Sequence, residues 1–352
     1  MATNLALIMA GGQGTRFWPW STAEKPKQFL PVAGSVPLVT QTFRRLARFI
    51  PPERIYVVAE ARYRELTLAA IPEMAAENYI VEPAARNTAP CLIWAGVVLA
   101  RRHPGSRLLV VPADHWIGDE ETFAGQLTAA LEMAGQAGIV TGGIRPDSPH
   151  TGYGYIQVDP GRCRRVDGTD FYASLGFREK PDAATAAEYV AAGTYYWNSG
   201  MFVYDLATFR RLLERHAPEY FAFQQELERA GDDPAAVAEA FARVRPESID
   251  YALMEKAEDV CTFPAAFHWN DVGSWSSVYD MGEKDADGNV CRGDTVVIGA
   301  RDSLVMGQGG VPVAVVGLEN VAVIHTASGV LVAPRDRLQQ VKDVIAELRR
   351  RG

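Results

Sequence analysis

The chain has 352 residues, which is enough for a large core and for two domains. Apolar residues make up 48% and charged residues 22%, a balance typical of globular proteins that excludes a disordered or fibrous chain. The net charge of −8 argues against a broad basic surface of the kind that binds nucleic acid, so we expect no such partner.

The sequence also shows neither a targeting signal nor a disulfide framework. Its N-terminus lacks the basic and apolar regions of a secretory signal, and no apolar run is long enough to cross a membrane. The four cysteines are widely spaced and form no Cys-x-x-Cys pair, which is typical of reduced thiols. We therefore expect a soluble, cytoplasmic protein without a membrane partner.

The first element of the chain is a short apolar run at residues 5–10, which predicts a buried strand. Three glycines follow it and allow a tight turn that presents backbone N–H groups to a ligand: Gly11, Gly12 and Gly14. Arg16 and Lys27 then add positive charge. This combination favours phosphate binding, although a plain surface turn would use the same glycines. The loop is neither a Walker A loop nor a dinucleotide fingerprint, because the residues that end both motifs are absent.

Strands and helices then alternate as far as residue 141. The predicted strands are 54–59, 79–81, 108–112 and 138–141, and the predicted helices are 37–49, 62–71, the segment after Asn87-Thr88, and 122–134. This order predicts a Rossmann-like α/β fold with a mixed, mostly parallel sheet and helices on both faces. Ligands of such sheets bind beyond the carboxyl ends of the strands, where the glycine loop, Glu82-Pro83 and Asp114 all fall. We expect these residues to share one site.

The second half of the chain is organised differently. Alternating apolar segments predict strands at 152–158, 171–177 and 197–204, and helical spacing occurs at 182–192, 206–215, 219–230, 234–242 and 249–256. The acidic, turn-prone segment 285–289 predicts a boundary between domains 1–284 and 285–352.

Beyond that boundary, four short β segments precede a helix at 336–350: 295–298, 311–316, 321–325 and 330–332. They predict a small β-helix-like domain. Its apolar strands suit packing on the first domain or on a second subunit, so we expect a homodimer.

Seven motifs occur in order along the chain: Gly-Gly-x-Gly-Thr-Arg with Lys-Pro-Lys-Gln-Phe, Glu-Pro-x-x-Arg-Asn-Thr, Pro-Ala-Asp-His, Gly-Tyr-Gly-Tyr-Ile, Glu-Lys-Pro, Trp-Asn-Ser-Gly-Met-Phe and Trp-Asn-Asp-Val-Gly-Ser-Trp. Together they resemble the mannose-1-phosphate guanylyltransferase (GDP-mannose pyrophosphorylase) family of the sugar nucleotidyltransferase superfamily, whose fold is GT-A-like. The resemblance runs from about residue 5 to residue 275, and the β segments resemble that family's C-terminal region. Longer members carry a phosphomannose isomerase domain, and we expect no such activity from this chain.

The resemblance implies transfer of GMP from GTP to α-D-mannose 1-phosphate, giving GDP-mannose and pyrophosphate with Mg²⁺ as the metal. The sugar phosphate would attack the α-phosphorus directly, without a covalent intermediate, so alignment and charge neutralisation matter more than a base. Two alternatives stay open. One is a nucleotidyltransferase for another nucleotide or sugar 1-phosphate, and the other is a non-catalytic regulatory paralogue that binds a GDP-sugar.

The resemblance also assigns catalytic and metal-binding roles. Arg16 and Lys27 match the family's cations on the triphosphate, and Lys27 is the expected transition-state stabiliser, with Lys25 either sharing that role or simply solvated. Asp114 and Asp271 match the Mg²⁺ ligands, since magnesium usually takes one or two protein carboxylates and completes its shell with phosphates and waters. A turn cap and an Asx turn are the alternative roles of these two aspartates.

The remaining matches concern the substrates. The expected nucleotide-binding residues are Gly11, Gly12, Gly14, Thr15, Glu82, Pro83, Arg86, Asn87 and Thr88. Either Glu82 or backbone carbonyls can read guanine, and Asn87 or Thr88 can also cap a helix. The expected sugar-phosphate residues are Gly154, Glu179, Lys180, Asn198 and Gly200, with Lys180 on the phosphate and Glu179 and Asn198 on hydroxyls. For the neighbouring aromatics we favour packing over sugar stacking: Tyr153, Tyr155 and Trp197.

Overall fold

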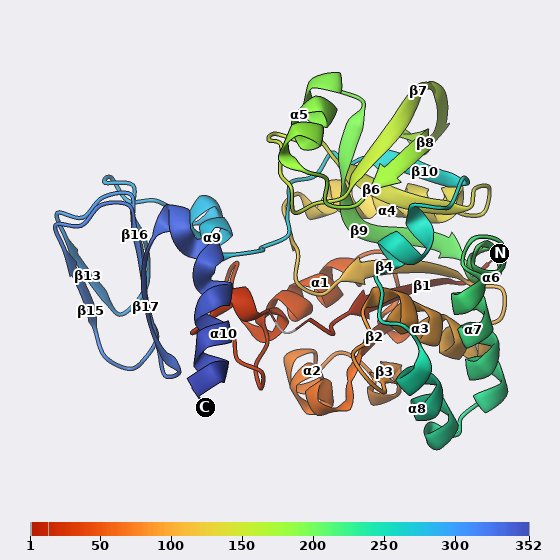
Figure 1. The fold of residues 1–352 in the computed structure, drawn as a ribbon, viewed down its shortest axis with the longest axis horizontal. Helices are drawn as coiled ribbons and strands as arrows, with labels where there is room; N and C mark the ends of the chain where they lie inside the picture. The colour runs from red at the N-terminus through yellow and green to blue at the C-terminus, as the bar shows by residue number, and fades with distance from the viewer. Residues whose placement is uncertain (1, 13, 352) are drawn as a thin grey trace. The chain divides into compact units, whose positions relative to one another are not determined.

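The computed structural model of the chain describes residues 2–12 and 14–351, so Gln13 of the predicted glycine loop and the side chain of Thr15 lie outside the description (Figure 1). The chain forms two compact units. The first contains Met1–Gly11, Phe43–Pro112 and Ile117–Trp269, and the second contains Gly12–Thr42, Ala113–Trp116 and Asn270–Gly352. Each unit is therefore assembled from separate stretches of sequence. The domain boundary between residues 284 and 285 stays a prediction.

A nine-stranded mixed sheet forms the centre of the first unit, with the strand order β3-β2-β1-β4-β9-β6-β10-β8-β7. β1, β2, β3 and β4 pair in parallel, whereas β9 is antiparallel to both β4 and β6. The bounds are β1 Asn4–Met9, β2 Ile55–Glu60, β3 Tyr79–Glu82, β4 Arg107–Pro112, β6 Ile139–Ile144, β7 Tyr155–Val166, β8 Thr169–Arg178, β9 Tyr195–Asp205 and β10 Val260–Pro264. The predicted α/β class with a mixed sheet is confirmed, and β10 is a strand that the sequence pattern missed.

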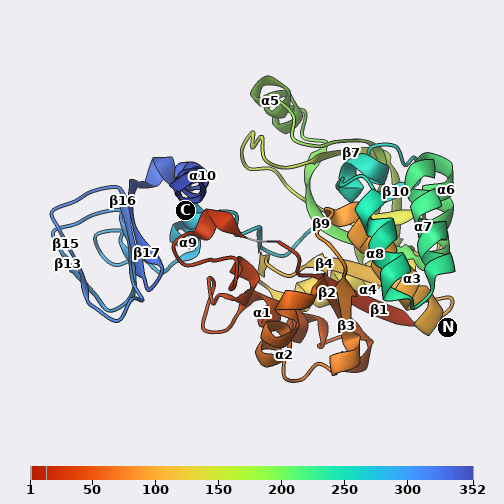
Figure 2. The same cartoon turned by 60° about the horizontal axis from the view of Figure 1, so that its bottom comes forward.

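Helices cover both faces of this sheet. They are α2 Arg64–Ala70, α3 Thr88–Arg102, α4 Glu120–Met133, α5 Ala183–Ala192, α6 Leu206–His216, α7 Pro218–Ala230 and α8 Pro234–Arg243. Alternate residues of a strand point to opposite faces, and Leu5, Leu7 and Val110 pack in one core with side chains of α3, α6, α7 and α8. α6, α7 and α8 lie side by side (Figure 2). α4 contacts β4, β6 and β9 from the other face (Figure 1).

The segment predicted as a helix at 249–256 contains a π-helix at Asp250–Met254. The Glu255 N–H donates to the carbonyl of Asp250 at 2.9 Å, five residues back, where an α-helix would use the carbonyl four residues back. A helix is therefore present in this segment as predicted, but helical spacing of apolar residues does not distinguish the π type of turn from the α type.

The second unit has the arrangement of a short β-helix, because the strands from β12 to β16 alternate between two sheets, β12-β14-β16-β17 and β13-β15, and β17 then pairs antiparallel with β16. The bounds are β12 Val290–Gly293, β13 Thr295–Ile298, β14 Leu304–Gly307, β15 Val313–Val316, β16 Val321–Thr326 and β17 Gly329–Pro334. β12, β14 and β16 are parallel, as are β13 and β15. The predicted β-helix-like domain is confirmed, with β12 and β14 as strands that the pattern missed.

Two helices complete this unit: α9 Trp275–Met281 and α10 Val341–Arg351, the latter preceded by a 3-10 helix at Arg335–Gln340. Three further elements contain residues of both units: α1 Leu38–Leu46, β5 Trp116–Ile117 and β11 Trp269–Asn270. None of the helices within residues 2–12 and 14–351 combines the length and the apolar character needed to cross a bilayer.

Residues 14–42, which contain Arg16 and Lys27, pack on the core of the second unit. Phe17 and Trp275 are fully buried, with ring centroids 5.2 Å apart, and Trp275 Nε1 donates to the carbonyl of Trp18 at 3.0 Å. Thr326 Oγ1 of β16 donates to the carbonyl of Pro19 at 2.9 Å. The C-terminal part of the chain therefore anchors the loop that carries Arg16 and Lys27.

Candidate active site

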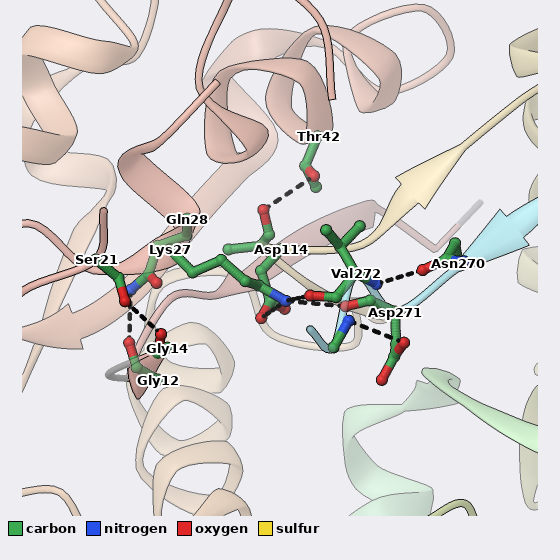
Figure 3. A network of polar contacts seen from close by, with 12 residues as sticks. Gly12, Gly14, Ser21, Lys27, Gln28, Thr42, Asp114, Asn270, Asp271 and Val272 are labelled. Atoms are coloured by element: carbon green, nitrogen blue, oxygen red, sulfur yellow. Dashed lines mark hydrogen bonds and ion pairs between the residues drawn. The ribbon is translucent and has the colours of Figure 1, made fainter. Parts of the chain in front are cut away.

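Lys27 is the centre of a polar network in the second unit (Figure 3). Its side chain is almost fully buried, and its Nζ lies 2.7 Å from Asp114 Oδ2. The same Nζ donates to the main-chain carbonyls of Asp271 and Val272, each at 2.8 Å. An ammonium group has three donors, so these three acceptors use all of them. One cation thus joins the segment that follows β4 to the segment that carries Asp271.

The carboxyl group of Asp114 is held in its ionised form. Burial alone would raise the pKa of Asp114, but the charge of the Lys27 ammonium, followed by that of His115, lowers this pKa below its usual value. The Asp114 side chain is nevertheless 35% exposed. It can therefore reach a ligand while it remains charged.

Asp271 contributes to the network through its backbone and keeps its side chain near the same space. Its Oδ1 accepts the Gly273 N–H at 3.1 Å, so the Asx turn considered above is present. A cavity of about 290 Å³ is lined by Gly14, Arg16, Phe17, Lys27, Asp114, His115, Asp271 and Gly273. The two predicted metal ligands and the two predicted catalytic cations therefore border one cavity.

This donor set fits a magnesium ion that arrives with phosphate. Mg²⁺ takes oxygen ligands and usually binds through one or two carboxylates, with phosphate oxygens and waters as its other ligands. Asp114 and Asp271 supply two carboxylates beside the cavity. Over residues 2–12 and 14–351, no group of three His, Cys, Asp or Glu side chains is close enough to hold a metal ion.

The glycine loop is shaped by its approach to Lys27. Gly14 has φ +58°, and a Cβ there would lie 2.8 Å from the Lys27 backbone nitrogen, so a side chain at this position would be strained and would collide. Gln28 Nε2 donates to the Gly12 carbonyl at 3.0 Å, and Ser21 Oγ donates to the Gly14 carbonyl at 2.6 Å. The loop carbonyls are thus held by neighbouring side chains.

Arg16 differs from Lys27 in being exposed to solvent. Among the residues that the structure describes, its guanidinium forms no ion pair, although it borders the cavity. A free guanidinium with several donors is suited to phosphate oxygens.

The predicted nucleotide-binding residues from Glu82 to Thr88 lie in the first unit, at the end of β3 and the start of α3. Glu82 is buried, and this burial, followed by the charge of Glu60, raises the pKa of Glu82 to about 7 against a partial opposing effect of the Arg86 N–H. A Cβ on Gly11 would lie 3.4 Å from Glu82 Oε2, so this carboxyl group lies against the start of the glycine loop. The exposed Pro83 follows it.

The neighbouring polar residues are partly occupied by structural contacts. Asn87 caps α3 by accepting the Thr88 N–H at 2.8 Å, which confirms the predicted cap. Thr88 Oγ1 accepts the Ile249 N–H at 2.9 Å, and Arg86 Nη2 donates to the Ala242 carbonyl at 3.3 Å.

The five predicted sugar-phosphate residues gather in another part of the first unit. The Asn198 N–H donates to the Gly154 carbonyl at 2.8 Å, and Lys180 Nζ lies 2.6 Å from Glu179 Oε1. A Cβ on Gly154 would collide with the Glu179 carboxylate. Gly200 has φ +70°, and its N–H donates to Asn198 Oδ1 at 3.1 Å.

Sequence reasoning missed one residue of this cluster and was right about its aromatic neighbours. Asp250 Oδ1 accepts a hydrogen bond from Asn198 Nδ2 at 2.9 Å. Asp250 lies in none of the motifs quoted above, and the only available signal was an acidic residue where apolar helical spacing begins. Tyr155 and Trp197 are buried together with Tyr153 packed against them, which confirms the predicted packing role.

Comparisons with known proteins show relatives of both parts of the chain. Residues 5–288 match the family model for nucleotidyl transferases, and residues 293–348 match a MannoseP isomerase/GMP-like β-helix domain. The alginate biosynthesis protein AlgA of Pseudomonas aeruginosa is 39% identical over 354 residues, which cover 99% of this chain and 73% of that protein. The mannose-1-phosphate guanylyltransferase of Escherichia coli K12 is 36% identical over 354 residues, with coverages of 98% and 73%. The crystal structure described as a mannose-1-phosphate geranyltransferase from Thermus thermophilus matches with a TM-score of 0.88 and 34% identity over 99% of both chains.

The raised pKa of Glu82 predicts a pH-dependent effect on stability. Because the folded-state pKa of about 7 exceeds the ordinary 4.5, wild-type stability should fall as pH rises between these values. The substitution Glu82→Gln keeps the side chain neutral, so it should increase the free energy of unfolding at pH 8 by up to about 3 kcal/mol and by much less at pH 5. Urea denaturation at both pH values measures this difference. Glu65→Gln, at an exposed position, is the control and should change neither value; equal effects of Glu82→Gln at pH 5 and pH 8 would contradict the prediction.

Proposed function

The chain belongs to the mannose-1-phosphate guanylyltransferase family of nucleotidyl transferases, and we propose that it transfers GMP from GTP to mannose 1-phosphate, forming GDP-mannose and releasing pyrophosphate. The Lys27 network supports this proposal most strongly. One buried ammonium contacts Asp114 and the backbone of Asp271 at the border of a cavity that Arg16 also lines. A transfer between two phosphate-bearing substrates needs this kind of concentrated charge.

The proposed reaction is a direct displacement at the α-phosphorus of GTP. An oxygen of the mannose 1-phosphate anion forms the new bond, and the bond from the α-phosphorus to the bridging oxygen of pyrophosphate breaks. Since the attacking group is already an anion, no side chain needs to remove a proton. Arg16 would bind and stabilise the charge that moves onto pyrophosphate, and Lys27 would add positive potential while it fixes Asp114 in its charged form.

Nucleotidyl transferases generally use divalent metal ions, and we assign Mg²⁺ to Asp114 and Asp271. When bound there with the substrate phosphates, the metal would supply further charge neutralisation. Asp114 suits this role because its pKa is lowered, and Asp271 because the Gly273 N–H orients its carboxylate.

We assign separate groups of residues to the nucleotide and to the sugar phosphate. The backbone of Gly11, Gly12, Gly14 and Thr15 would hold the GTP phosphates. The other proposed nucleotide-binding residues are Glu82, which can read the base, and Pro83, Arg86, Asn87 and Thr88, which can lie near phosphate or ribose. Glu179 and Asn198 would bind sugar hydroxyls between Gly154 and Gly200, and Lys180 would bind the sugar phosphate. Figure 3 shows the first of these regions around Lys27.

We also propose a cytoplasmic homodimer in which residues 1–284 form the catalytic domain and residues 285–352 the β domain. The two family-model matches, which end at residue 288 and begin at residue 293, support this domain boundary. Exposed apolar side chains on the outer faces of the β domain support self-association: Ile298, Val316 and Val332.

The substrate assignment is tested by measuring pyrophosphate release with each nucleoside triphosphate against several sugar 1-phosphates. We expect kcat/KM to be highest for GTP with mannose 1-phosphate, by about tenfold or more over the next pair, since a site built around specific polar groups rejects analogues that leave them unpaired. A different best pair would overturn the named substrates. Absence of turnover with every pair would instead favour a regulatory binding protein.

The metal assignment is tested with Asp271→Asn. The amide oxygen can still accept the Gly273 N–H, so the loop should keep its shape while one anionic ligand is lost. We expect kcat/KM to fall about 100-fold or more and to recover partly at higher Mg²⁺ concentration. Asp280→Asn changes an exposed aspartate of α9 and is the matched control. Wild-type turnover in Asp271→Asn at low Mg²⁺ would remove Asp271 from the metal site.

A further inference from the structure

Asp250 is a hydrogen-bond partner of the Asn198 amide, whose oxygen also faces the Thr141 hydroxyl at 3.5 Å. The Gly200 N–H donates to Asn198 Oδ1 at 3.1 Å, so the oxygen of this amide must face Gly200. The Asn198 Nδ2 group then faces Asp250 Oδ1 at 2.9 Å. Both ends of the amide are therefore engaged by the protein, and only one orientation satisfies both bonds. Without the Asp250 carboxylate, the nitrogen end of the amide would lose its partner.

The position of Asp250 is itself fixed by the backbone. It is the first residue of the π-helix, and its carbonyl accepts the Glu255 N–H at 2.9 Å. Glu255 Oε1 in turn accepts the backbone N–H of Glu179 at 3.0 Å, so this turn also contacts the strand end that carries Glu179 and Lys180. The π-helix thus connects the two arms of the predicted sugar subsite, Asn198 on β9 and Glu179 after β8.

The charges around Asp250 suit a ligand with several hydroxyl groups. Burial, followed by the charge of Glu179, raises the pKa of Asp250 to about 6, whereas Lys180 and the Ser248 hydroxyl act in the opposite direction. Glu179 is 9% exposed and pairs with Lys180. Two carboxylates beside one ammonium leave an excess of acceptors, which sugar hydroxyls can satisfy as donors.

We propose that Asp250 is a positioning residue of the sugar subsite, where it holds the Asn198 amide in the orientation that binds hydroxyl groups of a hexose 1-phosphate. This role rests on the proposed function, because it concerns the sugar side of that reaction. Loss of the Asp250 carboxylate should therefore weaken binding of the sugar phosphate and leave the affinity for GTP unchanged. A general stabilising role would give no such separation.

The test compares Asp250→Ala and Asp250→Asn by steady-state kinetics. Asp250→Ala removes the acceptor, and we expect the KM for mannose 1-phosphate to rise about tenfold while the KM for GTP changes less than about twofold. Asp250→Asn retains an oxygen that can accept from Asn198 Nδ2, so it should restore most of the affinity even if Asp250→Ala folds poorly. Asp233→Ala removes an aspartate that caps α8 and is the matched control, which should leave both KM values unchanged.

Two results would overturn the proposal: an unchanged KM for mannose 1-phosphate in Asp250→Ala, or equal increases for both substrates. Calorimetric titration with mannose 1-phosphate separates this proposal from the proposed function. If the wild type binds this ligand without turnover, the proposed function fails. In that case a tenfold weaker binding in Asp250→Ala still supports the role of Asp250, and equal binding contradicts it.

Discussion

The structure depends on one buried ammonium group and its need for three acceptors. A buried charge is strongly unfavourable unless it is paired and hydrogen-bonded, and Lys27 meets this requirement with Asp114 and the carbonyls of Asp271 and Val272. Other features follow from it. Gly14 must lack a side chain because the Lys27 backbone lies against it, and the residues after Phe17 are held by Trp275 and Thr326. Trp275 and Thr326, to which the sequence assigned no chemical role, therefore serve the proposed site by anchoring the loop that carries Lys27.

The pKa values of carboxyl side chains are shifted in opposite directions at the proposed subsites. Asp114 lies against an ammonium, so its pKa falls although it is partly buried, and it stays ionised, as the proposed metal ligand must. Glu82 is buried and Asp250 is partly buried, each near another carboxylate, so the pKa of Glu82 rises to about 7 and that of Asp250 to about 6. At neutral pH a fixed anion would thus serve the phosphate and metal region, while the base and sugar regions would contain carboxyl groups nearer to their titration points.

The sequence alone predicts those structural features that depend on contacts between residues near each other in the chain. The glycines after β1, the cap at Asn87 and the alternation of strands and helices follow from short-range patterns, and the structure agrees with them. What the sequence could not provide depends on distant contacts. The bond from Lys27 to Val272 joins residues 245 positions apart, so no periodicity could indicate that this lysine binds the Asp271 segment. Asp250 was missed for a related reason, because its role appears only when the π-helix meets Asn198, and apolar spacing cannot reveal that contact.

The central claim is that Lys27 and Asp114 stabilise each other and so hold the proposed site together. A double-mutant cycle on the free energy of unfolding, with Lys27→Gln, Asp114→Asn and the double variant, measures this interaction directly. Each single change leaves a polar or charged group without its partner, so the double variant should be less destabilised than the sum of the two. We predict a coupling energy of about 1.5 kcal/mol or more, the size found for contacting groups in one hydrogen-bond network. Additive effects, with a coupling energy within about 0.3 kcal/mol of zero, would contradict the account.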